Sequence, residues 1–117
     1  MAEEGQVIAV HTIEAWTDQL QKGIDSKKPI VVDFTASWCG PCRFIAPIFA
    51  DLAKRITNVI FLKVDVDELA PVAQEWKVHS MPTFVVLQEG NEVERIIGAK
   101  KEELLVKVEK LANVAAA

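Results

Sequence analysis

Two patterns of hydrophobic residues alternate along the chain, short continuous runs and recurrence every three or four positions. They predict which segments are strands and which are helices. Short runs rich in β-branched residues are typical of strands. They cover residues 7–10, 29–34, 59–64, 83–87 and 92–97. Between these runs, hydrophobic residues recur every three or four positions, which indicates helices with one buried face. The predicted helices cover residues 13–24, the segment from the cysteine pair to Asn58, a short segment from Asp65 or Asp67 to about Trp76, and residues 101–112.

The order of these elements predicts an α/β fold with a central mixed sheet of five strands and four flanking helices. The run 29–34 is almost continuously hydrophobic, which is typical of a central strand buried on both faces. A helix separates it from the run 59–64, so these two strands are expected to be parallel. Glu89-Gly90-Asn91 lies between the last two runs and predicts a hairpin, so the sheet is expected to end in antiparallel strands.

Polar residues and prolines indicate where the helices begin and bend. Thr12 precedes the first helix and is a suitable N-cap, with Glu14 in the first turn. Asp65 or Asp67 is expected to cap the short third helix. Pro47 lies inside the long second helix, where it removes a backbone hydrogen bond and is expected to cause a kink.

Length and charge narrow the class of protein. The 117 residues are expected to form a single domain, 1–117, because domains usually hold about 100–200 residues. The 13 basic and 17 acidic residues leave a net charge of −4 without a basic patch, so nucleic acid is not an expected partner. No hydrophobic run approaches the roughly 18 residues of a membrane span, so no membrane contact is expected.

The first residues bear on the cellular compartment. Residues 1–11 are acidic overall and lack the basic and hydrophobic regions of a secretory signal. Ala2, rather than glycine, follows Met1, so the N-myristoylation pattern is absent. A cytoplasmic location is therefore expected, where thiols are kept reduced and structural disulfides are uncommon.

The two cysteines of the sequence, Cys39 and Cys42, follow the strand 29–34 and open the long helix. Pro41 suits the first helical turn, because its missing N–H would have had no partner there. Cys39 is then expected at the helix N-terminus, where unpaired N–H groups and the helix dipole stabilise a thiolate. Cys42 lies one turn further on, within reach of a disulfide. Cys39 is expected to be the more exposed, attacking cysteine and Cys42 the resolving cysteine.

Other uses of the cysteine pair have weaker support. Zinc needs about four ligands, and the remaining candidates, His11 and His79, are far apart and expected at the surface. A structural disulfide that closes so short a loop stabilises little. The spacer Gly40-Pro41 is uncharged, so it favours the reduced dithiol less than a cation would. A reductase is therefore preferred to a disulfide oxidase or isomerase, and a protein-binding module gated by the pair remains an alternative.

The residues around the pair also resemble a known family. Residues 34–42, Phe-Thr-Ala-Ser-Trp-Cys-Gly-Pro-Cys, resemble the active-site signature of the thioredoxins. The similarity extends over nearly the whole chain, at Asp33, Pro47, residues 61–65, residues 81–84 and Gly98. The short acidic N-terminus and Arg43 are most similar to the plant cytosolic h-type. The resemblance implies the thioredoxin fold, with one thioredoxin domain over residues 1–117.

The resemblance implies roles for one acidic and one basic residue near the cysteines. Asp33 lies within the predicted buried strand, where desolvation is expected to raise its pKa. The resemblance implies that Asp33 helps to take the proton from Cys42 through water; the alternative is an aspartate that faces solvent at a strand end. Lys63, at the matching place on the neighbouring strand, is a candidate to pair with Asp33 and tune its titration, or else an ordinary surface lysine.

The resemblance also implies a surface that binds target proteins around Cys39. Pro82 matches the family's cis-proline, and this bend is expected to bring the backbone of Met81 beside Cys39, where it can pair with an extended target peptide. Trp38 is expected on this surface, with a core aromatic as the alternative. The expected target-binding residues are Trp38, Gly40, Pro41, Val78, Met81, Pro82, Gly98 and Ala99.

The implied activity is reduction of protein disulfides by thiol–disulfide exchange. The chain has no glycine-rich nucleotide-binding motif, so its electrons must come from a separate protein. The resemblance implies that this partner is an NADPH-dependent flavoprotein thioredoxin reductase, and that the other partners are target proteins that contain disulfides. The chain itself is expected to carry no cofactor and no metal.

Overall fold

The computed structural model describes residues 5–116, so the ends of the predicted domain, including Met1 and Ala2, lie outside the described residues. The strands are β1 (Val7–Val10), β2 (Ile30–Thr35), β3 (Ile60–Asp65), β4 (Thr83–Gln88) and β5 (Asn91–Ile97). The helices are α1 (Ile13–Ser26), α2 (Gly40–Arg55), α3 (Ala70–Glu75) and α4 (Lys101–Ala116). Within the described part of the chain, no helix combines the length and hydrophobicity needed to cross a membrane.

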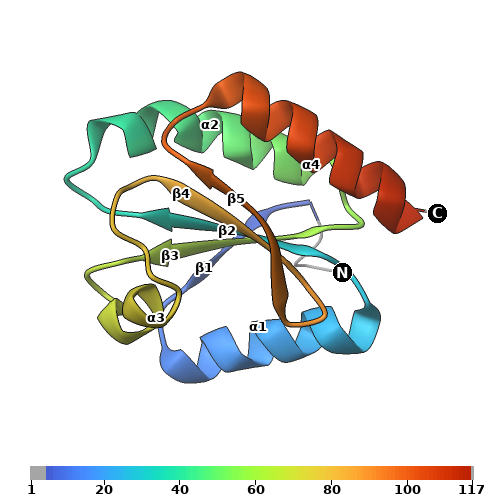
Figure 1. Cartoon of the computed structure of the whole chain (residues 1–117), viewed down its shortest axis with the longest axis horizontal. Coiled ribbons are helices and arrows are strands. Elements are labelled where there is room, and N and C mark those ends of the chain that lie inside the picture. Colours follow the sequence, from blue (N-terminus) through green and yellow to red (C-terminus); the bar gives the residue numbers. More distant parts are fainter. Residues whose placement is uncertain (1–4, 117) are drawn as a thin grey trace.

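The strands of the described residues form one mixed sheet in the order β1-β3-β2-β4-β5. β1 and β2 both run parallel to β3, whereas β4 is antiparallel to β2 and β5 is antiparallel to β4. Figure 1 shows the sheet between two layers of helices, with α2 and α4 on one face and α1 and α3 on the other. The predicted fold, a five-stranded mixed sheet flanked by four helices, is confirmed.

Hydrophobic side chains fill the space on both sides of the sheet. On the α2–α4 face, the ring of Phe49 packs against the rings of Phe61 and Phe84, with centroids 5.3 and 5.4 Å away. Leu104 of α4 belongs to the same core, and Trp16 of α1 belongs to the core on the opposite face. β2 is buried along residues 30–34 because helices cover both of its faces. The cysteine motif follows directly from the end of this enclosed strand.

α3 is shorter than predicted, and neither aspartate caps it. Its N-cap is Leu69, whose side chain makes no capping hydrogen bond. Asp65 Oδ1 instead accepts hydrogen bonds from the backbone N–H groups of Asp67 (2.8 Å) and Glu68 (3.2 Å), which forms a turn ahead of the helix. The predicted cap is wrong because Pro71 belongs to the first helical turn, so the helix begins only after this turn.

Other element boundaries follow from local backbone chemistry. Thr12 caps α1 as predicted, since its Oγ1 accepts the backbone N–H of Ala15 at 3.0 Å. α2 ends three residues before Asn58, the predicted end. The predicted hairpin between β4 and β5 is confirmed, and its turn residues Glu89 and Gly90 both have left-handed backbone angles, with φ of 50° and 86°.

Candidate active site at the cysteine pair

Cys39 lies where the chain leaves β2 and enters α2. It is the N-cap of α2, with an extended backbone conformation (φ −96°, ψ 111°), and Pro41 follows in the first turn. The Sγ atom of Cys39 accepts a hydrogen bond from the backbone N–H of Cys42 at 3.2 Å, which is the contact that N-cap side chains make. A thiolate on Cys39 therefore lies against helix N–H groups and the positive end of the helix dipole.

The sulfur atoms of Cys39 and Cys42 are joined in a disulfide, so the structure represents the oxidised protein. The two Cα atoms are 5.3 Å apart, within the range that disulfides accept. The exposed fraction is 5% for Cys39 and 3% for Cys42. Cys39 is therefore more exposed than Cys42, as predicted, but only slightly. Both cysteines are largely covered, and a target must approach them through the residues that surround them.

Asp33 is buried in the middle of the sheet. Only 2% of Asp33 is exposed, and its Oδ1 has no hydrogen-bond partner within the described residues. Burial raises the pKa of this carboxyl to about 7, and the positive charge of Lys63 partly opposes the rise. Lys63 lies directly opposite Asp33 in the parallel register of β2 and β3, with an exposed side chain. The alternative of a solvent-facing aspartate is therefore excluded.

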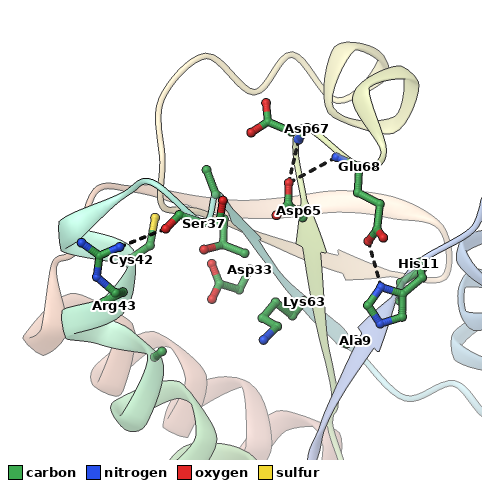
Figure 2. A pocket seen from close by; sticks show the side chains of 14 residues that line it. Ala9, His11, Asp33, Ser37, Cys42, Arg43, Lys63, Asp65, Asp67 and Glu68 are labelled. Carbon is green, nitrogen blue, oxygen red and sulfur yellow. Dashed lines mark hydrogen bonds and ion pairs between the residues drawn. The ribbon is translucent and has the colours of Figure 1, made fainter.

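A hollow of about 710 Å³ lies beside this carboxyl. Asp33, Cys42 and Lys63 all line the hollow, and Figure 2 shows Asp33 between the other two. Arg43 borders the same hollow, where its Nη1 donates a hydrogen bond to the carbonyl oxygen of Ser37 at 2.9 Å. The hollow therefore brings Cys42 and the Asp33 carboxyl to one shared space.

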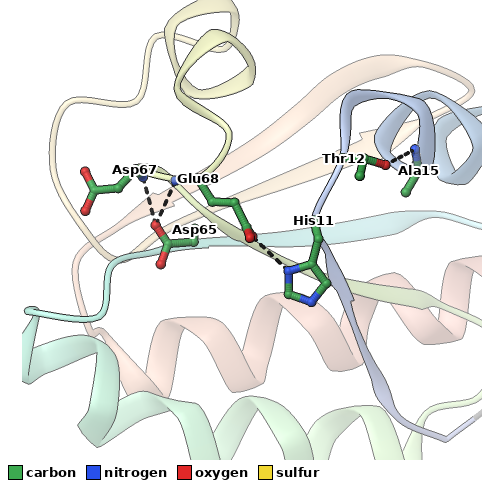
Figure 3. Close-up of polar contacts among 6 residues, drawn as sticks. All are labelled: His11, Thr12, Ala15, Asp65, Asp67 and Glu68. Carbon is green, nitrogen blue, oxygen red and sulfur yellow. Dashed lines mark hydrogen bonds and ion pairs between the residues drawn. The ribbon is translucent and has the colours of Figure 1, made fainter.

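Exposed polar residues form another part of this hollow's lining. Figure 3 shows the turn in which Asp65 accepts backbone hydrogen bonds, and beside it the contact between His11 Nδ1 and Glu68 Oε1 at 2.8 Å. Both partners of this contact are exposed, so it contributes little to stability. Within residues 5–116, no three His, Cys, Asp or Glu side chains are grouped as metal ligands would be.

The segment that precedes β4 passes beside the cysteine pair. The Met81–Pro82 peptide bond is cis, as the resemblance implied. The carbonyl oxygen of Met81 lies 3.6 Å from Cys39 Sγ, and the Met81 side chain packs against the cluster of Ala36 and the two cysteines. The backbone N–H of Gly98 donates to the carbonyl oxygen of Pro82 at 2.8 Å. The Met81 backbone therefore lies next to Cys39, and Gly98 is hydrogen-bonded to the residue that follows Met81.

Comparison with known proteins agrees with this geometry. The family model described as Thioredoxin matches residues 7–110. The chain belongs to the thioredoxin family. Thioredoxins are protein-disulfide oxidoreductases, and the two cysteines lie at disulfide distance in the motif that carries this activity. The chain is therefore a protein-disulfide reductase that acts by thiol–disulfide exchange, with reductases and disulfide-containing proteins as its classes of partner.

Several thioredoxins illustrate the similarity. A thioredoxin H-type from Ricinus communis is 69% identical over 103 residues, which are 88% of this chain and 87% of that protein. The crystal structure of a thioredoxin from Nicotiana alata matches with a TM-score of 0.87 and 46% identity, over 94% of this chain and 96% of that chain. A thioredoxin f2, solved in complex with ferredoxin:thioredoxin reductase, matches with a TM-score of 0.84 and 32% identity, over 92% of this chain and 96% of that chain.

In this thioredoxin, the other predicted target-binding residues differ in exposure. Trp38 is 63% exposed, which excludes the alternative of a core aromatic. Gly40 and Pro41 are exposed, Gly98 and Ala99 are half-buried, and Pro82 is buried. Val78 is half-buried and packs against the core on the α1–α3 face. Of the predicted residues that are distant in sequence from Cys39, Met81 is the one whose contact with it the structure records.

Two residues near the thioredoxin motif were missed by sequence reasoning. Asp67 Oδ2 accepts a hydrogen bond from Trp38 Nε1 at 2.8 Å. The two residues are 29 positions apart, so no local pattern connects them. Phe44 of α2 is exposed two residues after Cys42. Phe44 lies outside the buried stripe of α2 that contains Ile45. A large hydrophobic residue outside the buried stripe is the sequence signal that could have indicated an exposed hydrophobic side chain here.

Proposed function

We propose that Cys39 is the nucleophile and Cys42 the resolving cysteine in the reduction of target disulfides. The Cys39 thiolate attacks one target sulfur, a mixed disulfide forms, and the other target sulfur leaves as a thiolate. The Cys42 thiolate then attacks Cys39 Sγ, releases the first target sulfur and forms the Cys39–Cys42 disulfide. The main support for this assignment is the hydrogen bond from the backbone N–H of Cys42 to Cys39 Sγ, 3.2 Å long, at the helix N-terminus. This contact stabilises negative charge on Cys39.

Asp33 is proposed to take the proton that Cys42 loses, and Lys63 to tune the Asp33 carboxyl. A pKa of about 7 supports this role, because a carboxyl that is half ionised near neutral pH can both accept and return a proton. The shared hollow supports a transfer through water between Asp33 and Cys42. The charge of Lys63 keeps the pKa of Asp33 lower than burial alone would make it.

Target proteins are proposed to bind over the surface around Cys39. An extended target segment would pair with the backbone of Met81, which lies beside the attacking sulfur. The small residues nearby let another backbone come close, since an added Cβ at Gly40 would meet nothing within 4 Å. The proposed binding residues are Trp38, Gly40, Pro41, Val78, Met81, Pro82, Gly98 and Ala99.

The proposed electron donor is an NADPH-dependent flavoprotein thioredoxin reductase. The 69% identity to an h-type relative supports this donor over a ferredoxin-linked one, because the thioredoxin f2 bound to the latter is 32% identical. Loss of NADPH absorbance with purified flavoprotein reductase and an oxidised target tests the donor, and recharging by the ferredoxin-linked enzyme alone would contradict it. The proposed location is the cytoplasm, and the proposed organisation is one domain over residues 1–117.

Replacing each cysteine in turn tests the two proposed roles. Cys42→Ser is expected to accumulate mixed disulfides with target proteins through Cys39, because no second thiol remains to release them. Cys39→Ser is expected to capture none and to lose turnover of a protein disulfide with dithiothreitol as the electron source. Capture by Cys39→Ser instead would reverse the roles. Absence of turnover in the unchanged protein would indicate a binding module.

A further inference from the structure

Arg95 joins β5 to the C-terminal end of α3. It lies opposite Val85 of β4, and only 22% of its side chain is exposed. Its Nε and Nη2 atoms donate to Oε2 and Oε1 of Glu92, each at 2.8 Å. Nη2 also donates to the carbonyl oxygen of Trp76 at 2.7 Å, and Nη1 donates to that of Lys77 at 3.2 Å. One guanidinium thus connects a strand with a helix end.

The carbonyl groups that Arg95 binds belong to the point where α3 stops. Trp76 is the C-cap of α3, and Lys77 has a left-handed backbone conformation (φ 55°) that turns the chain away from the helix. The last carbonyl groups of a helix have no partners within the helix, and a positive charge is favoured beside them. Arg95 therefore stabilises the point from which the next loop starts.

The next loop, residues 76–82, carries Met81 to the cysteine pair; Figure 1 shows its path between α3 and β4. Arg95 binds the start of this loop. At the other end, the N–H of Gly98 donates to the carbonyl oxygen of Pro82 at 2.8 Å. Both ends of the loop are therefore held by residues of β5 or of the segment that directly follows it.

We propose that Arg95 is a positioning residue for target proteins, because it holds the start of the loop 76–82 and so places the Met81 backbone where a target segment pairs with it. The inference rests on the proposed function, in which Cys39 attacks the target and Met81 aligns it. A small disulfide reaches the sulfur without pairing with the backbone. Loss of the Arg95 contacts therefore slows the reduction of protein disulfides and spares that of small ones.

The test compares two substrates in single turnovers of the reduced protein, with insulin as the protein disulfide and Ellman's reagent as the small disulfide. Arg95→Met keeps a long side chain and removes all four hydrogen bonds. It lowers the rate constant with insulin on the order of tenfold, as a small misplacement of reacting groups does. The rate constant with Ellman's reagent changes less than about twofold. Arg95→Lys keeps the charge but not the fork of donors, so its rate with insulin lies between those of the wild type and Arg95→Met.

Two further measurements separate positioning from a general structural role. Arg55→Met is the matched control, because Arg55 is likewise an ion-paired arginine, with Asp51 and Glu109, but lies at the far end of α2. It leaves both rate constants unchanged. Amide hydrogen exchange reports on the loop itself. The N–H of Val78 donates to the carbonyl oxygen of Ala73 at 2.9 Å, and in Arg95→Met its exchange accelerates while exchange in β3 does not.

Two outcomes would overturn the inference. One is an unchanged rate with insulin in Arg95→Met, and the other is an equal loss with both substrates, which would indicate a change at the cysteines themselves. If Arg95→Met does not fold, the rate constants of Arg95→Lys with insulin and with Ellman's reagent test the inference in the same way. Failure of the proposed function is distinguishable, because Cys39→Ser would then form a mixed disulfide with insulin through Cys42.

Discussion

Asp33 carries a carboxyl that ionises in different pH ranges in the folded and the unfolded protein. Burial raises its pKa from 3.8 to about 7 on folding, against the opposing charge of Lys63. Between these values the folded state keeps a proton that the unfolded state releases. Asp33 therefore destabilises the folded protein least below about pH 4. The destabilisation grows as the pH rises and is complete above about pH 7.

Asp33→Asn is expected to remove this pH dependence, because asparagine has a similar shape and carries no charge. The pKa difference corresponds to about 4 kcal/mol, so near pH 8 the free energy of unfolding should rise by roughly 2–4 kcal/mol. Near pH 4 the variant and the wild type should differ by less than about 1 kcal/mol. Urea unfolding of the oxidised proteins at both pH values measures the difference.

The control for this experiment is Asp18→Asn, which changes an exposed aspartate of α1. Its free energy of unfolding should follow that of the wild type at both pH values, within about 0.5 kcal/mol. If Asp33→Asn shows the same pH dependence as the wild type, the Asp33 carboxyl does not titrate near neutral pH, and its proposed role as proton acceptor loses its basis.

At the scale of the element, the helix starts differ in how much the local sequence decides. Thr12 is in an extended conformation (φ −134°, ψ 158°) and caps α1 with its own side chain, so the start of α1 is encoded within four residues. The start of α3 instead depends on Pro71 and on the preceding turn, in which the Asp65 side chain accepts the backbone N–H of Asp67 and does not cap the helix. A capping residue type predicts a helix start only where no neighbouring turn uses the same side chain.

Thr12→Ala is expected to lower the free energy of unfolding by about 1 kcal/mol, because the N–H of Ala15 loses the acceptor shown in Figure 3. Thr12→Ser keeps a hydroxyl in place and should lose less than half of that amount. Chemical denaturation of the oxidised proteins measures both values. Equal losses in the two variants would mean that the threonine methyl group, rather than the capping hydrogen bond, stabilises α1.

At the scale of the whole molecule, α4 completes the core on the α2–α4 face of the sheet. Leu104 is 0% exposed and belongs to the same core as Phe49 of α2. Val106, two residues further along α4, is 63% exposed. The same helix therefore offers one position at which a hydrophobic side chain is essential for packing and one at which it is not.

Leu104→Ala is expected to lower the free energy of unfolding by about 3 kcal/mol, because it leaves a cavity in a closely packed core. Val106→Ala is the matched control and should change it by less than about 0.5 kcal/mol. The folded fraction of both variants should react with Ellman's reagent at the wild-type rate, since α4 contributes no residue to the proposed site. A small loss in Leu104→Ala would show that the core rearranges to fill the space.

Local sequence patterns predicted the site only where its parts are close together in the chain, and the places of Lys63 and Met81 came from the family resemblance. Cys39 and Cys42 are separated by a single helical turn, and the strand-to-helix junction that places them can be recognised from adjacent residues. The bond from Trp38 to Asp67 spans 29 positions, and the bond from Arg95 to Trp76 spans 19. Such pairs depend on strand order and side-chain direction, which periodicity does not contain.

By itself, the sequence determined the alternation of strands and helices, the helix N-terminus behind Cys39 and the burial of the strand that holds Asp33. These features follow from hydrophobic spacing and from the conformational limits of proline and glycine, which act within one or two turns of chain. Only the tertiary structure decided how Asp67 and Arg95 are arranged around the site. The reason is physical, because the energies that place them arise from packing and hydrogen bonds between segments that meet only when the sheet has formed.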